Sequence, residues 1–163
     1  ADNFLSLLRR AGPFLRPESL IALCDQDDVW FPERLGFGLE RLAPIDPDHP
    51  AMVFHFALIT DANLEHPRRS AARPRPPGFR NALVQNIAQG STILLNRAAT
   101  DLVCAAAAEP EAVVMHDWWI YLLVTGVGGT AICDQREVLF YRQHGGNEIG
   151  ANDGLRAKLL RMR

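Results

Sequence analysis

Apolar residues fall into short blocks separated by polar turns and prolines, and these blocks predict helices and strands that alternate along the chain. Buried strands are expected at residues 20–24, 51–60 and 91–96, and as a pair at residues 130–134 and 137–143. Helices are expected at residues 3–10, from residue 31 onward, at residues 81–89, 97–108 and 111–125, and as a basic amphipathic segment at residues 155–162. This alternation is typical of a layered α/β domain.

Local signals support two of these helices. Asp2 is a suitable cap for the first one, and Gly12 ends it. Leu35, Leu39 and Leu42 recur at the spacing of one face of the second helix, so we expect this face to lie against the core.

Residues 66–80 contain four prolines and five arginines, a composition that disfavours any regular element. We interpret this segment as a mobile loop. It is either a solvated linker or a basic flap that faces phosphate or lipid.

The overall composition narrows the class of protein. The chain has 163 residues, of which 48% are hydrophobic and 22% charged, as in one globular domain with a real core. Its net charge of −2 gives no reason to expect nucleic-acid binding. Cys24, Cys104 and Cys133 form no Cys-x-x-Cys pair, and their odd number argues against a secreted disulfide framework. We therefore expect reduced thiols in a cytoplasmic protein.

The sequence contains no run of 18 apolar residues and no basic N-terminal region followed by an apolar core. We therefore expect neither a transmembrane span nor an ordinary signal peptide within this chain. Docking at the inner face of the membrane is left open.

An acidic turn follows the first predicted strand. A buried strand that delivers Asp25 and Asp27 to its end places carboxylate oxygens where Mg2+ or Mn2+ can be held. These cations in turn bind phosphate oxygens, so a metal–diphosphate is the expected ligand. The alternative is an acidic surface turn in which Asp28 caps the next helix.

Two further segments carry candidate chemistry. Asp117 lies in an apolar helical segment between His116 and Trp118, where a carboxylate is costly unless it is paired or faces a cleft, as a general base does. A helix-capping or solvent-facing role for Asp117, and a core role for His116, are the alternatives. At the end of the last strand Arg142 can clamp a phosphate and His144 can ligate a cation, although a plain strand exit has the same pattern.

Five short motifs in order resemble the bacterial family 2 glycosyltransferases, in particular the rhamnosyltransferase-like group that builds O-antigen and capsule polysaccharides of the cell envelope. The resemblance runs from about Asn3 to Gly150. The motifs are Asn3-Phe4-Leu5, the Cys-Asp-Gln-Asp-Asp-Val-Trp run at 24–30, Gly90-Ser91-Thr92 with Asn96-Arg97, His116-Asp117-Trp118-Trp119, and the Tyr-Arg-Gln-His-Gly-Gly-Asn run at 141–147.

The resemblance implies a GT-A-type layered sheet with helices on both faces, truncated at the N-terminus. Residues 1–150 would form the metal- and acceptor-binding portion, and residues 151–163 a basic amphipathic helix. The implied activity is metal-dependent, inverting transfer from a nucleotide-sugar such as dTDP-rhamnose to a glycan or lipid-linked acceptor.

The resemblance also implies roles for individual residues. Asp117 would be the catalytic base. The other roles are the following: Asp25, Asp27 and His144 on Mg2+ or Mn2+; Arg142 and Gln143 at the donor diphosphate; Gly90, Ser91, Thr92, Trp118 and Trp119 at the acceptor.

Two departures from the family pattern keep other functions open. The nucleoside-binding unit that opens the family's domain is absent from this chain, and Phe56 stands where relatives have a polar residue. One alternative is a non-catalytic, truncated module for glycan binding or subunit assembly. Another is a different metal-dependent phosphotransfer enzyme, which would leave His116 to Trp119 unexplained.

Overall fold

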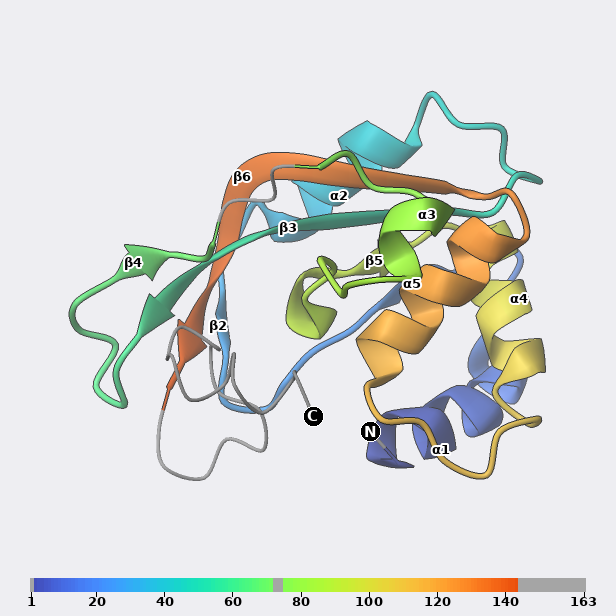
Figure 1. Ribbon diagram of the computed structural model, residues 1–163, viewed down its shortest axis with the longest axis horizontal. Helices are drawn as coiled ribbons and strands as arrows, with labels where there is room; N and C mark the ends of the chain where they lie inside the picture. Colours follow the sequence, from blue (N-terminus) through green and yellow to red (C-terminus); the bar gives the residue numbers. More distant parts are fainter. Residues whose placement is uncertain (1, 72–74, 144–163) are drawn as a thin grey trace.

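One long buried strand, β3 (Ala51–Thr60), lies at the centre of a curled six-stranded sheet (Figure 1). The structure is a computed structural model, and it describes residues 2–71 and 75–143. The other elements in chain order are α1 (Asp2–Ala11), η1 (Gly12–Phe14), β1 (Ile21–Ala22), β2 (Val29–Trp30), α2 (Arg34–Leu42), β4 (Arg68–Arg69), α3 (Phe79–Ala82), η2 (Gly90–Thr92), β5 (Leu94–Leu95), α4 (Arg97–Ala106), α5 (His116–Gly126) and β6 (Thr130–Arg142).

The sheet order is β1-β5-β3-β6-β2, and β4 pairs with the far end of β3. Only the β3–β6 pairing is parallel among the strand pairs of the described residues. In this pair Phe54 lies opposite Cys133, whereas Thr60 lies opposite Arg142, so β6 uses three more residues than β3 over the same length. These extra residues sit in bulges, which bend a strand and increase its twist. The bulges account for the curl of the sheet.

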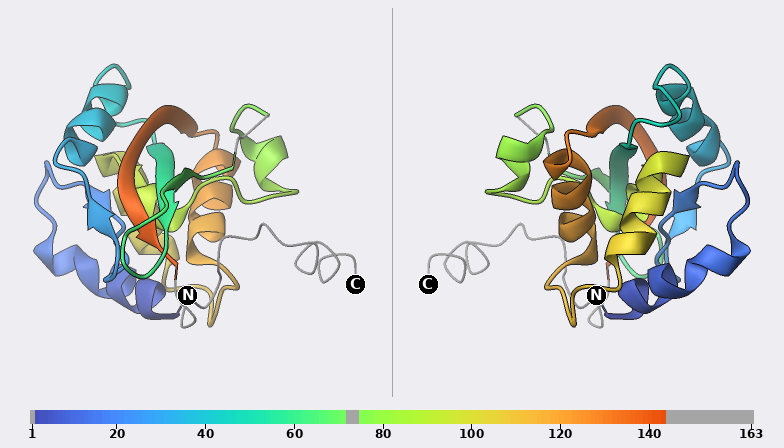
Figure 2. Two further views of the ribbon diagram at one scale, coloured as in Figure 1. Left: turned by 90° about the vertical axis from the view of Figure 1, so that its left-hand side faces the viewer. Right: turned by 90° about the vertical axis from the view of Figure 1, so that its right-hand side faces the viewer.

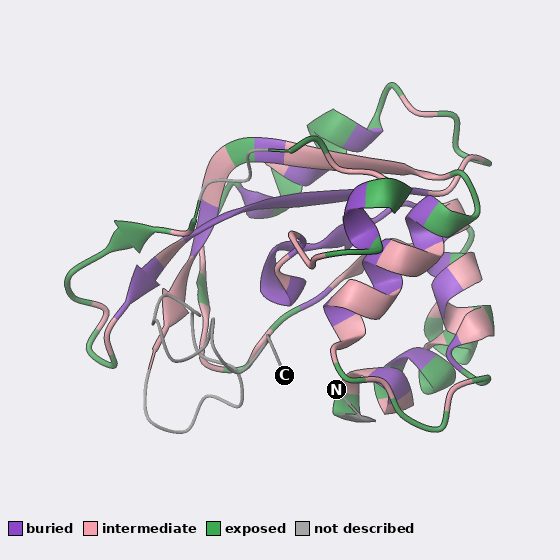
Figure 3. Ribbon diagram, viewed as in Figure 1, coloured by how far each residue is buried: buried purple, intermediate pink, exposed green. Residues whose placement is uncertain are grey.

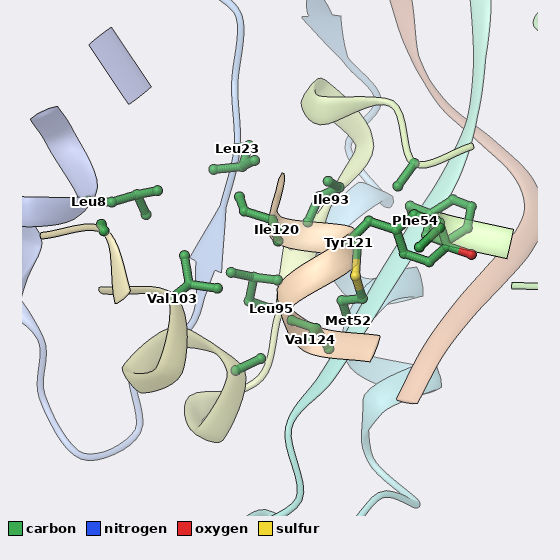
Figure 4. Close-up of a cluster of buried hydrophobic side chains, with 14 of the residues drawn as sticks. Leu8, Leu23, Met52, Phe54, Ile93, Leu95, Val103, Ile120, Tyr121 and Val124 are labelled. Atoms are coloured by element: carbon green, nitrogen blue, oxygen red, sulfur yellow. The ribbon is translucent and has the colours of Figure 1, made fainter. Parts of the chain in front are cut away.

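Helices cover both faces of the sheet. On one face α2 places Leu42 against Val53 and Leu94. On the other face the main core gathers side chains of α1, α4 and α5 around β3 and β5, as Figure 4 shows for Leu8, Val103, Ile120, Met52 and others. The predicted α/β class, with helices on both faces, is confirmed.

The strand β3 is buried almost throughout, as its purple ribbon in Figure 3 shows. A near-continuous apolar sequence is typical of a strand that is covered on both faces. The exception in β3 is His55, which is only 1% exposed. Its Nδ1 lies 3.3 Å from the carbonyl oxygen of Thr92, and its Nε2 has no hydrogen-bond partner among the described residues.

The predicted apolar face of α2 was wrong in part. Leu35 and Leu39 are 45% and 49% exposed, and the buried residues of the helix are Arg34, Gly38 and Leu42. Gly38 allows the close approach, because a Cβ there would come within 2.5 Å of the Leu94 side chain. The helix is therefore rotated by about one residue from the face that its leucines predict.

Several predicted boundaries also differ. The strand pair at residues 130–134 and 137–143 is one continuous strand, β6, because Asp134 accepts hydrogen bonds from the backbone and side chain of Arg136 within a bulge. The helix at residues 111–125 begins only at His116, since Met115 is extended. The helix predicted at 81–89 is α3, which ends at Ala82, and the strand predicted at 91–96 is reduced to β5 after the 3-10 turn η2. Residues 68–69, predicted to be irregular, form β4.

The remaining predictions concern the cysteines, membrane spans and segments outside the described residues. No disulfide joins Cys24, Cys104 or Cys133 within the described residues. Within residues 2–71 and 75–143 no helix is long and apolar enough to cross a membrane. The amphipathic helix at 155–162, His144 and part of the predicted mobile loop (residues 72–74) lie outside the described residues.

Asn96 joins β3 to α4. Its Oδ1 accepts a hydrogen bond from the backbone N–H of Ala51 and another from Ala99, each at 2.9 Å, and so caps α4. Its Nδ2 donates to the carbonyl oxygen of His49 at 2.8 Å. One buried side chain thus satisfies backbone groups of two elements that are far apart in the sequence.

We expect Asn96→Ala to lower the free energy of unfolding by about 2–4 kcal/mol, because it removes a helix cap and leaves the buried Ala51 N–H without a partner. Urea unfolding followed by circular dichroism measures the loss. Asn96→Asp is the matched control: it keeps the capping oxygen but loses the donor to His49, so its loss should be smaller. Equal losses for the two variants would contradict the capping role.

His55 should make stability depend on pH. Burial lowers its pKa, and the hydrogen bond to the Thr92 carbonyl only partly offsets this. As the pH falls below about 6.5 the unfolded chain binds a proton that the folded chain resists, so stability is lost by up to about 1.4 kcal/mol per pH unit. Unfolding free energies between pH 7.5 and 5.5, measured for the parent and for His55→Phe, test this. We expect the parent to lose more than the variant on acidification, and parallel curves would contradict the assignment.

Candidate active site

The acidic segment, residues 23–28, runs from one edge of the sheet to the other. It follows β1, which pairs with β5 at one edge, and leads into β2, which pairs with β6 at the opposite edge (Figure 1). Its middle is a turn in which the Asp28 N–H approaches the Asp25 carbonyl oxygen at 3.4 Å. The carboxylates of this segment therefore lie across the end of the curled sheet.

Arg34 contacts the start of the acidic segment and the strand that follows it. The side chain is only 3% exposed, and its Nη2 donates to the carbonyl oxygen of Leu23 at 2.8 Å. Its guanidinium also lies over the Trp30 ring, 3.4 Å from the ring centroid, which is a cation–π contact. Burial lowers the pKa of Arg34 to about 10, so it stays protonated at neutral pH. A buried positive charge thus underlies the carboxylates.

Asp25 lies within electrostatic range of two other carboxylates. Burial raises the pKa of Asp25 above its ordinary value, and the charges of Asp27 and Asp117 raise it further, while Arg34 acts in the opposite direction. The structure therefore brings Asp25, Asp27 and Asp117 into one acidic neighbourhood. Such a neighbourhood favours a cation.

Asp28 is not the cap of the next helix, since Glu33 occupies the N-cap position of α2. Both of its carboxylate oxygens are shielded from solvent. Burial raises its pKa to about 6, although the nearby Ser91 hydroxyl and the backbone of Arg142 lower it. The Asp28 carboxylate thus faces inward, toward η2 and the end of β6.

Asp117 lies in the first turn of α5 and is 9% exposed. Its Oδ2 accepts a hydrogen bond from the Gly90 N–H at 3.1 Å, and its Oδ1 accepts one from the Trp118 N–H at 2.8 Å. The N-terminus of a helix carries partial positive charge, which stabilises an anionic side chain there. The carboxylate is therefore held in one orientation beside η2.

Gly90 leaves no room for a side chain. A Cβ at this position would lie 2.8 Å from Nε2 of His116 and 3.4 Å from Cβ of Asp117. His116 is itself stacked on Phe4 of α1, with ring centroids 3.8 Å apart and an interplanar angle of 11°. Burial lowers the pKa of His116, so a neutral, packed ring is favoured. His116 thus fits the core role that the sequence left open.

The two tryptophans of α5 lie on different sides of the helix. Trp118 donates its Nε1–H to the Ala82 carbonyl oxygen of α3 at 2.7 Å. Trp119 lines an apolar groove with Leu122 and Val127 on the outer side of α5. Residues two apart on a helix point about 200° from each other, so Trp119 projects away from Asp117. The geometry gives no support to an acceptor role for Trp119 at Asp117.

The other residues predicted for the acceptor side lie in η2. The Thr92 hydroxyl donates to the Gln89 carbonyl oxygen at 2.8 Å, and the Ser91 hydroxyl lies 3.4 Å from Nε2 of Gln89. Both residues are buried. Their hydroxyls therefore serve the turn and the neighbouring Asp28.

The end of β6 meets the acidic segment through Arg142. Its Nε donates to the Asp27 carbonyl oxygen at 3.2 Å and its Nη1 to the Ala62 carbonyl oxygen at 2.9 Å. The backbone N–H of Gln143 donates to Thr60, which continues the sheet by one residue. Arg142 thus lies beside the predicted diphosphate site.

The carboxylates of the acidic segment do not form a ready-made group of three closely spaced cation ligands within the described residues. Within the described residues, the group of three ligand atoms that lie within 4.8 Å of one another is Asp61, Glu65 and His66, in the turn after β3. The Asp61 carboxylate there already accepts two backbone N–H groups. Asp25 and Asp27 are not part of such a group, so a cation bound to them would need further ligands from a bound phosphate.

Sequence reasoning missed Arg34 and the inward position of Asp28. Arg34 lies on one helix face with Gly38 and Leu42, but this spacing alone does not show that the face is buried. Arginine is ordinarily exposed, so the residue type gave no sign of burial either.

Comparison with known proteins finds a distant relative. No protein-family model matches the chain. The chain is similar to the dTDP-rhamnosyl transferase RfbG of Shigella flexneri. The alignment of 169 positions covers 98% of the chain at 22% identity. The match covers 54% of that protein, so the chain spans about half the length of the curated relative it matches. The chain thus has a distant relative named as a glycosyltransferase.

Proposed function

We propose that this chain carries the catalytic and acceptor-binding part of a metal-dependent, inverting glycosyltransferase. It would move a sugar from a nucleotide-sugar donor to a growing polysaccharide or lipid-linked acceptor. The observation that carries the proposal is the position of Asp117, which is fixed at Gly90 within electrostatic range of Asp25. The distant similarity to a dTDP-rhamnosyl transferase favours dTDP-rhamnose as the first donor to test.

Asp117 is the proposed general base. Its carboxylate would take the proton of an acceptor hydroxyl as the hydroxyl oxygen bonds to the anomeric carbon of the donor sugar. The bond from that carbon to the diphosphate breaks at the same time, and the nucleoside diphosphate leaves. One displacement from the opposite side inverts the anomeric configuration and needs no enzyme nucleophile.

Asp25 and Asp27 are the proposed ligands for Mg2+ or Mn2+. Their oxygen donors suit these cations, and the acidic neighbourhood around Asp25 supports the fit. When bound, the cation would neutralise charge on the donor diphosphate. Arg142, which contacts the Asp27 backbone, would stabilise the same charge.

We expect Asp117→Asn to lower kcat by roughly 100- to 10,000-fold with little change in donor KM, because an amide cannot take the proton of the acceptor hydroxyl. The amide nitrogen also replaces one of the two oxygens that accept backbone N–H groups, so circular dichroism is used to check that the variant is folded. Release of nucleotide from dTDP-rhamnose is measured for this chain and for any longer natural form that contains it. The exposed Asp101→Asn in α4 is the control and should keep full turnover. An equal loss of donor binding in Asp117→Asn would contradict the base assignment. Absence of turnover with any donor in every form would favour the non-catalytic alternative.

We expect Asp27→Ala to abolish metal-dependent transfer while circular dichroism shows an intact fold, because the cation loses a protein ligand. EDTA should have the same effect on the parent. Glu65→Ala is the matched control, since it removes a ligand atom from the other candidate cation group. Undiminished turnover in EDTA, or loss of metal dependence in Glu65→Ala alone, would contradict the assignment of the cation to Asp27.

A further inference from the structure

Exposed apolar side chains gather where α3 lies on α5. Phe79, Leu83 and Val84 are 45%, 58% and 66% exposed, and Val127, just after α5, is 55% exposed. The two groups are continuous, because the Phe79 ring comes within 3.3 Å of the position that a Cβ on Gly126 would take. We call these residues, with Trp119, the α3–α5 patch.

The outer side of α5 adds a groove to this patch. Trp119, Leu122, Leu123 and Val127 line it, and its walls are almost wholly apolar. A tryptophan beside an open apolar surface is suited to the boundary between water and lipid, where one part of the indole is buried and its N–H stays hydrated.

The charge beside α3 has one sign. The chain as a whole carries 19 acidic residues and a net charge of −2, yet no Asp or Glu occurs between Glu65 and Asp101 or between Asp117 and Asp134. The first of these stretches includes α3, and both Arg80 within α3 and Arg75 before it are exposed. The nearby Glu109 and Glu111 precede the N-terminal end of α5, away from Val127. The α3 side of the patch is therefore basic, whereas the loop that carries Asp46 and Asp48 meets Thr130, beyond Val127.

We propose that the α3–α5 patch docks on an anionic lipid bilayer. Apolar side chains that enter the boundary between headgroups and acyl chains, flanked by arginines that meet anionic headgroups, are the combination that such a surface binds. A second copy of the chain fits less well, because a symmetric contact would bring Arg75 and Arg80 of both copies together without acidic partners. The proposal does not depend on the catalytic assignment.

The opposite side of the molecule provides a matched control. Figure 2 shows α2 on the side away from α3 and α5. There Leu35 and Leu39 are 45% and 49% exposed, but Glu33 and Glu40 flank them, so the charges are mixed. This surface offers similar apolar exposure without a basic flank.

Vesicle sedimentation tests the proposal on the whole chain. The probes are vesicles of phosphatidylcholine alone and of phosphatidylcholine with phosphatidylglycerol. We expect binding to the anionic vesicles, a loss of about tenfold or more in Leu83→Glu/Val84→Glu, and a loss of about fivefold for each of Arg75→Gln and Arg80→Gln. Leu35→Glu/Leu39→Glu should bind like the parent.

A fluorescence measurement checks the orientation. Brominated lipids should quench the emission of Trp119, and the quenching should fall in Trp119→Phe. Binding that survives Leu83→Glu/Val84→Glu would overturn the proposal and assign lipid binding to another part of the chain, such as residues 155–163. Absence of vesicle binding would also overturn it, and so would a dimer in light scattering that the same substitutions dissociate.

Discussion

The near-complete burial of β3 is the constraint on which the rest of the structure depends. A strand with no exposed face or edge must have its backbone groups paired on both sides and its side chains covered on both faces. β5 and β4 pair with one edge and β6 with the other, while α2 and the helices around α5 cover the faces. Even His55 lies in this strand, although its Nε2 has no hydrogen-bond partner in the part of the chain that the structure describes.

The same core fixes the position of one part of the candidate active site. α5 packs its Ile120 and Tyr121 into the main core, so its N-terminus, and with it Asp117, has a fixed place relative to the sheet. Other contacts fix the acidic segment: Arg34 donates to the Leu23 carbonyl oxygen, and Arg142 at the end of β6 donates to the Asp27 carbonyl oxygen. Carboxylates from two separate segments can therefore face each other at one site although their mutual repulsion opposes it.

Some of this could be predicted from sequence because it depends on local patterns. β3 matches residues 51–60, and α4 begins at Arg97 after a capping asparagine. The face of α2 could not be predicted, since the burial of Arg34 depends on a carbonyl oxygen and an aromatic ring outside the helix. The residue types of the site were predictable, but the contact of Asp117 with Gly90 was not fixed by spacing, because it requires α5 to pack beside η2.

The route of the acidic segment restricts how many residues it can have. Residues 23–28 reach at most roughly 20 Å when extended, and strand spacings of about 4.8 Å place the two edges of a flat sheet of this order at a similar separation. A turn fits within that segment only because the sheet is curled. A deletion here would pull the sheet edges together, and an insertion would let the carboxylates drift from Asp117. Natural variants of this protein should therefore keep the length of this segment.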